Sequence, residues 1–168
     1  MPDFNKPLPY VFIGDDAFPM RHNLIKPYSH TDLTWEERIT NYRISRARRI
    51  IENTFGILAA RFRIYRRPII AKVETIESIT KATVVLHNYL MKNRFEEYNS
   101  YCPNGFVDSN QICGEWRRET QTDSGFLPLS RLGTNNYTRD AKKIRDTFSE
   151  YFNSTSGSVP WQNDMVSV

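Results

Sequence analysis

The longest continuous pattern in the sequence runs from Thr34 to Phe62 and predicts a single long helix. Thr34 and Glu37 have the spacing of a capping box, in which each side chain accepts a hydrogen bond from the other residue's backbone N–H. Apolar residues then recur every three or four positions and form one stripe along a helix: Ile44, Ala47, Ile51, Phe55, Leu58 and Phe62. At about 1.5 Å per residue this helix spans roughly 40 Å, so the rest of the chain has to pack along it.

The same region concentrates positive charge. From Arg38 to Arg67 there are nine arginines, no lysine and a single acid, Glu52. This segment carries +8 while the whole chain carries +4, so the remainder carries −4. Arginine grips phosphate with two parallel hydrogen bonds, and each neutralised phosphate releases a counterion. The pattern therefore indicates a phosphate-binding surface; the alternative is an ordinary solvated helix face.

A short apolar run near the N-terminus predicts a buried strand. Leu8 to Ile13 contains β-branched and aromatic residues, and the run stops at Gly14. Asp15 and Asp16 follow directly. Since α/β sheets present ligand sites at the carboxyl ends of their strands, Asp15 is a candidate site residue.

The other segments of the chain show weaker periodicity of apolar residues. We expect irregular structure around residues 19–27, because prolines bound that stretch. A short edge strand is predicted within 64–72, and further helices over 74–92 and 138–152. Residues 95–136 lose periodicity and gather Asn, Ser, Gly and Pro, which predicts an irregular surface segment or linker.

Several classes of protein are excluded by composition. No run of 18 apolar residues occurs, so no segment is expected to span a membrane. The two cysteines, Cys102 and Cys113, lack CxxC spacing and clustered histidines, which argues against a zinc site. Reduced thiols in a cytosolic or nuclear protein are the simplest reading.

Glu52 is the second candidate site residue. Its helix face is shared with small residues and cations that would let a ligand approach closely: Ser45, Arg48, Gly56, Ala59 and Arg63. The alternative is that Glu52 only neutralises Arg48 or Arg49 one turn away. Acids converging from different elements bind the divalent ions that phosphodiester cleavage needs, and Mg²⁺ prefers carboxylate oxygens.

Three segments in this order carry a family resemblance: PYVFIGDDAFPM, NYRISRARRIIENTFGILAARFRI and VVLHNYL. They resemble the C-terminal half of the catalytic domain of PIF/Harbinger-type DDE transposases, over about residues 8–91. The later IRDTFSEYF and VPWQ segments are more weakly similar. The resemblance implies an α/β, RNase H-like (DDE transposase/integrase) fold, here truncated at the N-terminus and with a helical C-terminal part.

The resemblance also implies an activity and its residues. Members of the family use an Asp-Asp-Glu triad with Mg²⁺ or Mn²⁺ to cut DNA at transposon ends and to join the freed 3′ hydroxyl to a target. The second aspartate of the triad falls on Asp15 and the glutamate on Glu52, as catalytic and metal-binding residues. Asp16 falls on a variable position. The first aspartate has no match, and we expect it upstream of the Leu8 strand.

The resemblance further implies the domain organisation and the partners. We expect residues 1–95 to be the C-terminal portion of a DDE endonuclease domain, 96–136 a linker, and 137–168 a helix followed by a flexible tail in which Trp161 docks. DNA is the expected substrate. A Myb/SANT-like partner protein or a homo-oligomer is expected by resemblance, in the nucleus. The residues expected to contact DNA phosphates are Arg46, Arg48, Arg49 and Arg63.

Three functions remain open at this point. The chain is a metal-dependent DNA endonuclease subunit, a non-catalytic DNA- or protein-binding remnant of a transposase, or a decayed fragment. His87 is predicted to be a hydrogen-bonded core residue, and Phe55, Phe62 and Tyr65 to be core side chains and not base-stacking platforms.

Overall fold

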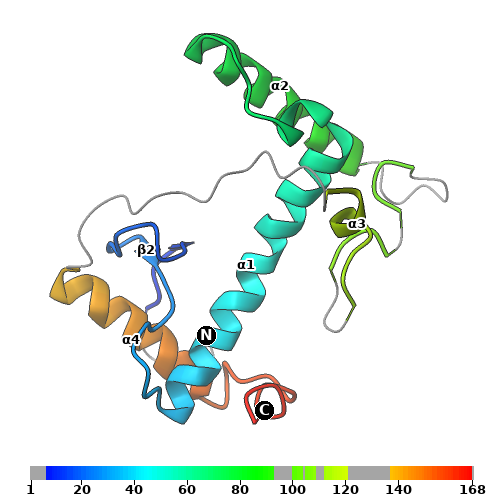
Figure 1. The fold of residues 1–168 in the computed structure, drawn as a ribbon. Coiled ribbons are helices and arrows are strands. Elements are labelled where there is room, and N and C mark those ends of the chain that lie inside the picture. Colours follow the sequence, from blue (N-terminus) through cyan, green and yellow to red (C-terminus); the bar gives the residue numbers. More distant parts are fainter. Residues whose placement is uncertain (1–6, 93–99, 104, 109–111, 121–136, 168) are drawn as a thin grey trace. The chain divides into compact units, whose positions relative to one another are not determined.

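The computed structural model describes residues 7–92, 100–103, 105–108, 112–120 and 137–167 (Figure 1). The chain divides into two compact units. Unit 1 comprises Met1–Arg48 and Leu129–Val168, and unit 2 comprises Arg49–Pro128. The described residues are mostly helical, with one two-stranded parallel sheet. None of the described helices is long and apolar enough to cross a membrane.

The predicted long helix is confirmed as α1, Trp35–Arg61. Its start is fixed by the predicted capping box. The Glu37 N–H donates to Thr34 Oγ1 at 3.3 Å, and the Thr34 N–H donates to Glu37 Oε2 at 3.0 Å. Two backbone donors that a helix end leaves unsatisfied are thereby paired.

The sheet belongs to unit 1 and consists of β1 (Phe12–Ile13) and β2 (Leu24–Ile25), paired in parallel. The predicted strand over 8–13 is thus confirmed only at its carboxyl end. The prediction that it is buried is wrong, because β2 is its one partner in the described two-stranded sheet and Phe12 stays 73% exposed. The stretch 19–27, predicted to be irregular, contains β2. The chain reverses again just before β2, where the backbones of Arg21 and Leu24 exchange hydrogen bonds at 2.9 and 3.1 Å, and β2 then runs parallel to β1. The Gly14 N–H extends the pairing by donating to Ile25 O at 2.9 Å.

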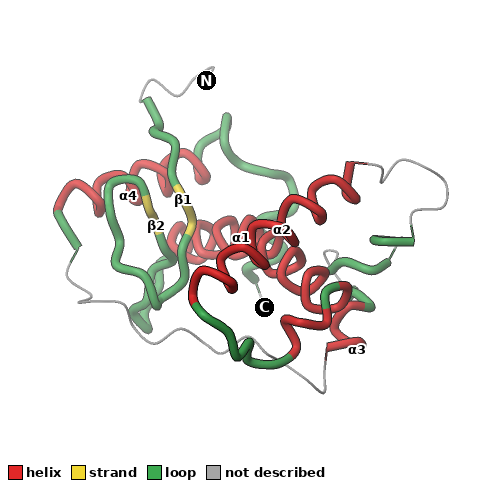
Figure 2. Tube along the Cα trace, turned by 90° about the horizontal axis from the view of Figure 1, so that it is seen from above, coloured by secondary structure: helices red, strands yellow, loops and turns green. Residues whose placement is uncertain are grey.

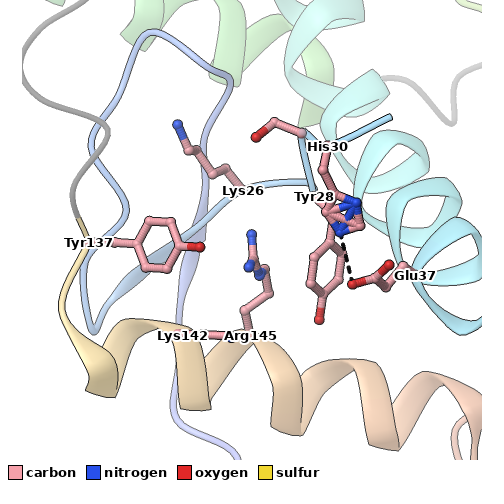
Figure 3. A pocket seen from close by; sticks show the side chains of 8 residues that line it. Lys26, Tyr28, His30, Glu37, Tyr137, Lys142 and Arg145 are labelled. Atoms are coloured by element: carbon pink, nitrogen blue, oxygen red, sulfur yellow. Dashed lines mark hydrogen bonds and ion pairs between the residues drawn. The ribbon is translucent and has the colours of Figure 1, made fainter. Parts of the chain in front are cut away.

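The third predicted helix is confirmed as α4, Arg139–Asn153, capped by the Thr138 side chain. It contacts β2 in unit 1 (Figure 2). Buried apolar side chains form the core of this unit: Met20, Ile25, Ile39, Ile44, Ala141 and Val166. A cavity of about 240 Å³ lies beside them, lined by residues of α4 and of the segment after β2 (Figure 3).

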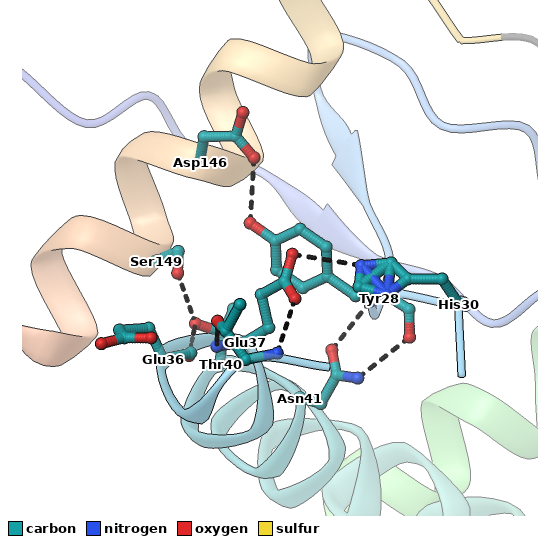
Figure 4. A network of polar contacts seen from close by, with 9 residues as sticks. Tyr28, His30, Glu36, Glu37, Thr40, Asn41, Asp146 and Ser149 are labelled. Atoms are coloured by element: carbon teal, nitrogen blue, oxygen red, sulfur yellow. Dashed lines mark hydrogen bonds and ion pairs between the residues drawn. The ribbon is translucent and has the colours of Figure 1, made fainter. Parts of the chain in front are cut away.

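A polar network connects the first turns of α1 to α4 (Figure 4). Thr40 Oγ1 donates to Ser149 Oγ at 2.8 Å, and the Tyr28 hydroxyl donates to Asp146 Oδ1 at 2.9 Å. Asn41 pairs with both backbone groups of Tyr28 through its side-chain amide, at 2.8 and 2.9 Å. Burial and the hydrogen bond to Asp146 raise the pKa of Tyr28 to about 12, so this phenol stays neutral.

The C-terminal tail, predicted to be flexible, is folded against unit 1 over 154–167. Arg43 holds it by donating to Gly157 O at 2.9 Å and to Gln162 Oε1 at 3.1 Å. Burial lowers the pKa of Arg43. Trp161 docks only in part: the Arg46 guanidinium lies 5.2 Å from its ring centroid, but the residue stays 44% exposed.

Unit 2 contains the rest of α1, a 3₁₀ helix η1 (Arg63–Arg66), α2 (Val73–Lys92) and α3 (Trp116–Thr120). The predicted helix over 74–92 is confirmed as α2. The predicted strand within 64–72 is wrong, because Arg66 turns back and donates to the last free carbonyls of α1, those of Ala59 and Ala60. This closes the helix end and bends the chain out of an extended path.

The segment 95–136 is more than a linker. Its described parts supply Cys102 and Phe106, which are buried with Ile57 and Ala60 as the core of unit 2. His87 is confirmed as a core residue, 6% exposed, with Nδ1 2.8 Å from the Tyr101 hydroxyl. Burial lowers the pKa of His87 and raises that of Tyr101 to about 12.

Of the three aromatic side chains predicted to pack in the core, Phe55 does not. It keeps 48% of its surface exposed, and Ile51 one turn earlier keeps 45%. Phe62 and Tyr65 are partly buried, and the Tyr65 hydroxyl hydrogen-bonds Thr83 Oγ1. The apolar stripe of α1 is therefore covered at Leu58 but open around Phe55.

The small-residue face of α1 is occupied by the chain's own Trp116. A Cβ placed on Gly56 would lie 2.3 Å from the Trp116 ring. The ring is fixed in that position, because Trp116 Nε1–H donates to Asn53 Oδ1 at 3.0 Å. Gly56 therefore serves packing inside unit 2.

The contact between Gly56 and Trp116 decides whether the mutation Gly56→Ala stabilises or destabilises the chain. Helix propensity alone predicts that Gly56→Ala stabilises the chain by about 1 kcal/mol. The clash with Trp116 predicts destabilisation of about 1–3 kcal/mol by overpacking, measured by denaturant unfolding. With Trp116→Ala as the background, Gly56→Ala should become neutral or stabilising, since the two changes share one contact. A stabilising Gly56→Ala in the otherwise natural chain would contradict this packing.

Candidate metal and phosphate site

Asp15 lies in the loop directly after β1, as predicted. Its side chain is 44% exposed; Oδ1 accepts the Ala17 N–H at 3.0 Å and Oδ2 lies 4.0 Å from Arg48 Nη2. The preceding Gly14 is buried, and a Cβ there would lie 2.9 Å from Leu24 Cδ2. Only a residue without a side chain lets β1 and β2 approach this closely, so Gly14 sets where Asp15 emerges.

Asp16, the weaker candidate, occupies a different environment. Its carboxylate is exposed and lies 3.7 Å from the Nζ of the buried Lys26. The two neighbouring aspartates of unit 1 are therefore each beside a cation, but only Asp15 is beside an arginine of α1.

Glu52 lies in unit 2, where its side chain is exposed on α1. Its negative charge contributes to raising the pKa of Arg117, after the larger effect of the hydrogen bond from Arg117 to Asp108. The next residue, Asn53, accepts the Asp108 N–H at 2.9 Å. Glu52 thus emerges from a stretch of helix that the following loop holds in place.

Asp108 is a charged site that sequence reasoning missed. Arg117 Nε donates to Asp108 Oδ1 at 2.9 Å, and the Gly114 N–H donates to the same oxygen at 2.7 Å. The Arg117 hydrogen bond holds the pKa of Asp108 below its usual value. No periodic signal marks this residue, and only the fold brings it against α1.

Several arginines of the basic segment are used inside the protein. Arg43 and Arg61 donate to the carbonyls of Gly157 and Tyr101, and Arg66 closes the end of α1. The exposed arginines of the segment are Arg38, Arg63 and Arg67. The surface that is open to phosphate is therefore smaller than a count of nine arginines indicates.

The predicted phosphate-contacting residues fall in both units. In unit 1, Arg46 donates to the Tyr42 hydroxyl at 3.0 Å and stacks on Trp161, while Arg48 lies beside Asp15. In unit 2, the charge of Arg49 helps to lower the pKa of Asp108, after the larger effect of Arg117.

Arg63 begins η1 in unit 2, with its side chain exposed. Of the four predicted phosphate-contacting residues it is the one classed as exposed, since Arg46, Arg48 and Arg49 are partly buried.

The donor chemistry of the two acids fits a hard divalent ion. Both present carboxylate oxygens to solvent, which Mg²⁺ prefers. Within the described ranges, no three His, Cys, Asp or Glu side chains cluster as a ready-made cation site. Asp15 belongs to unit 1 and Glu52 to unit 2, and their predicted convergence stays a prediction.

Comparison with protein families decides the assignment. The family model for DDE superfamily endonuclease matches residues 3–88, just over half of the chain. The chain belongs to the DDE superfamily endonuclease family. The region matched to the DDE endonucleases includes both Asp15 and Glu52 and ends one residue after His87. No curated protein and no solved structure matches the chain. Endonucleases of this superfamily generally use divalent metals.

The Asp108–Arg117 pair gives this DDE endonuclease chain a specific pH dependence. Because the folded pKa of Asp108 lies below the ordinary value of 3.8, the pair's stabilisation is present above that value and is lost as pH falls through the folded pKa. Denaturant unfolding is measured from pH 7 to pH 2.5. The free energy of unfolding of the wild type should exceed that of Asp108→Asn at pH 7, and this difference should shrink toward zero at pH 2.5. A difference in stability that is independent of pH would contradict the assignment.

Proposed function

We propose that this chain is part of a PIF/Harbinger-type, transposase-derived nuclease with an RNase H-like fold. Asp15 and Glu52 supply two carboxylates of its Asp-Asp-Glu site for Mg²⁺ or Mn²⁺. The observation that carries the proposal is the family match, which spans both acids. The exposed Asp15 carboxylate at the end of β1, next to an arginine of α1, supports it.

The chain's own residues have separate tasks in this function. Asp15 is oriented by the Ala17 N–H, which leaves Oδ2 facing the Arg48 guanidinium. Glu52 projects from a helix that Asn53 ties to the Asp108 loop. When bound, divalent ions activate the attacking oxygen and stabilise the leaving oxygen of the phosphodiester. Arg48, Arg49, Arg46 and Arg63 are the proposed phosphate contacts.

The proposal includes the biological setting implied by the resemblance. The substrate is DNA, and the place of action is the nucleus. A Myb/SANT-like protein or a second copy of the chain is the proposed partner. In this proposal residues 1–95 belong to the endonuclease domain and 137–168 form the C-terminal helix and tail. The segment 96–136 between them also contributes Cys102 and Phe106 to the core of unit 2.

Metal binding tests the proposal directly. Mn²⁺ titration by isothermal calorimetry should give an affinity that falls by at least about tenfold in both Asp15→Asn and Glu52→Gln, since losing even a partner of a metal ligand costs that much. Plasmid nicking with Mn²⁺ should fall in the same two variants. The matched controls are Asp16→Asn, one residue away, and Glu74→Gln, an exposed acid at the start of α2. Unchanged Mn²⁺ affinity in Glu52→Gln would refute the shared site.

The second candidate function is DNA binding without cleavage, favoured by the exposed arginines of the basic segment. The affinity for a DNA duplex should then fall as the salt concentration rises. A plot of the logarithm of the binding constant against the logarithm of the salt concentration should have a slope of roughly −0.9 for each phosphate neutralised. Arg63→Gln should reduce that slope by about one unit, as measured by fluorescence anisotropy. Lys81→Gln is the control, because Glu77 already neutralises that lysine at 3.3 Å. A slope unaffected by Arg63→Gln would exclude this contact.

A further inference from the structure

The cavity of unit 1 contains a buried arginine whose hydrogen-bonding capacity is incompletely used. Arg145 on α4 is 5% exposed, and its guanidinium points into the cavity of about 240 Å³ (Figure 3). Its Nε is buried and has no hydrogen-bond partner among the described residues. A buried charged donor left unpaired is costly, so this arrangement indicates a missing acceptor.

Aromatic rings line the cavity around the guanidinium. Arg145 Cζ lies 3.9 Å from the centroid of the Tyr28 ring and 5.5 Å from that of Tyr137. Cation–π contact uses the face of a guanidinium, whereas its N–H groups point outward in the plane. Tyr28 therefore contacts Arg145 through its ring, and this contact does not use the Nε–H donor.

The acids near the cavity already have partners. Asp146 accepts the Tyr28 hydroxyl, and Tyr28 itself stays neutral because its pKa is raised to about 12 by burial and this hydrogen bond. Glu37, the carboxylate in the lining, accepts the Thr34 N–H and lies 3.2 Å from His30 Nε2. Glu37 is therefore committed to the capping box of α1.

Two further cations complete the lining. Lys26 is buried after β2, and Lys142 is exposed one turn before Arg145 on α4. Lys26 Nζ lies 3.7 Å from the exposed Asp16. Lys26 is thus already paired with an acid, as Glu37 is committed to the capping box. The positive charge that remains at the cavity comes from Arg145 and Lys142, and it favours an anion with several acceptor oxygens.

We propose that this cavity is a binding site for a phosphate group. Arg145 donates in its plane to the phosphate oxygens, and Lys142 contributes charge from the rim. The site uses neither Asp15 nor Glu52, so it succeeds or fails independently of the proposed metal site. A free phosphate and a backbone phosphate of DNA present the same chemistry, and the experiment separates them.

Neighbouring lysines of α4 provide a matched test. Lys142 and Lys143 are both exposed, but only Lys142 lines the cavity. Inorganic phosphate is titrated into the full chain at constant ionic strength with EDTA present, and followed by calorimetry. Lys142→Ala should weaken phosphate binding about threefold or more, and Lys143→Ala should leave it unchanged. Arg145→Met should weaken it by about tenfold or more, as expected for a charge-assisted hydrogen bond.

The outcomes are decisive in either direction. Equal effects of Lys142→Ala and Lys143→Ala, or no effect of either, would overturn the proposal even if Arg145→Met fails to fold. A second arm measures binding of a short DNA duplex by anisotropy. Loss of both phosphate and duplex affinity in Lys142→Ala assigns the site to the DNA backbone. Loss of phosphate affinity alone assigns it to a free phosphate.

Discussion

The rest of this structure depends on one constraint: the arginines of the basic segment have almost no acids near them in the sequence to pair with. A segment with nine arginines and one glutamate cannot neutralise itself along its own helix. In the described residues these arginines contact backbone carbonyls, aromatic rings and acids from other segments, such as Glu119, which lies 3.7 Å from both Arg61 and Arg66. Arg43 is held by the C-terminal tail and stacks on Phe152, while Arg61 is held by Tyr101 and lies over Phe106. Elements remote in sequence are thereby fixed to α1 in each unit.

This constraint also limits how many arginines of the basic segment face solvent. Arginines that donate to carbonyls have a structural task, so fewer side chains of the basic segment face solvent than its nine arginines indicate. Arg48 next to Asp15 is the informative case, because it joins the basic helix to the loop after β1 within unit 1. Both residues lie in the region that matches the DDE superfamily endonuclease family. Arg145 in the cavity of unit 1 is a different case: its guanidinium lies over the Tyr28 ring, and its buried Nε has no hydrogen-bond partner among the described residues.

The predictions from sequence were wrong where the local pattern favours one structure and a contact with a remote segment favours another. The strand predicted within 64–72 had suitable apolar residues, but the carbonyls at the end of α1 needed donors and Arg66 turned back to supply them. The small residues around Glu52 suggested access for a ligand, yet Trp116 fills the space over Gly56. Both outcomes depend on partners that no periodicity within the segment reveals.

The sequence alone determined α1, α2 and α4, the capping box at Thr34, and the position of Asp15 after a strand. These features follow from hydrogen bonds and apolar spacing within a few residues of each other. Only the tertiary structure decided which arginines donate hydrogen bonds within the protein. It also decided that Phe106 and Cys102 form a core and that Arg145 faces a cavity. Those outcomes arise from contacts between segments tens of residues apart, and such contacts are selected by shape and by unsatisfied polar groups, which leave no local pattern.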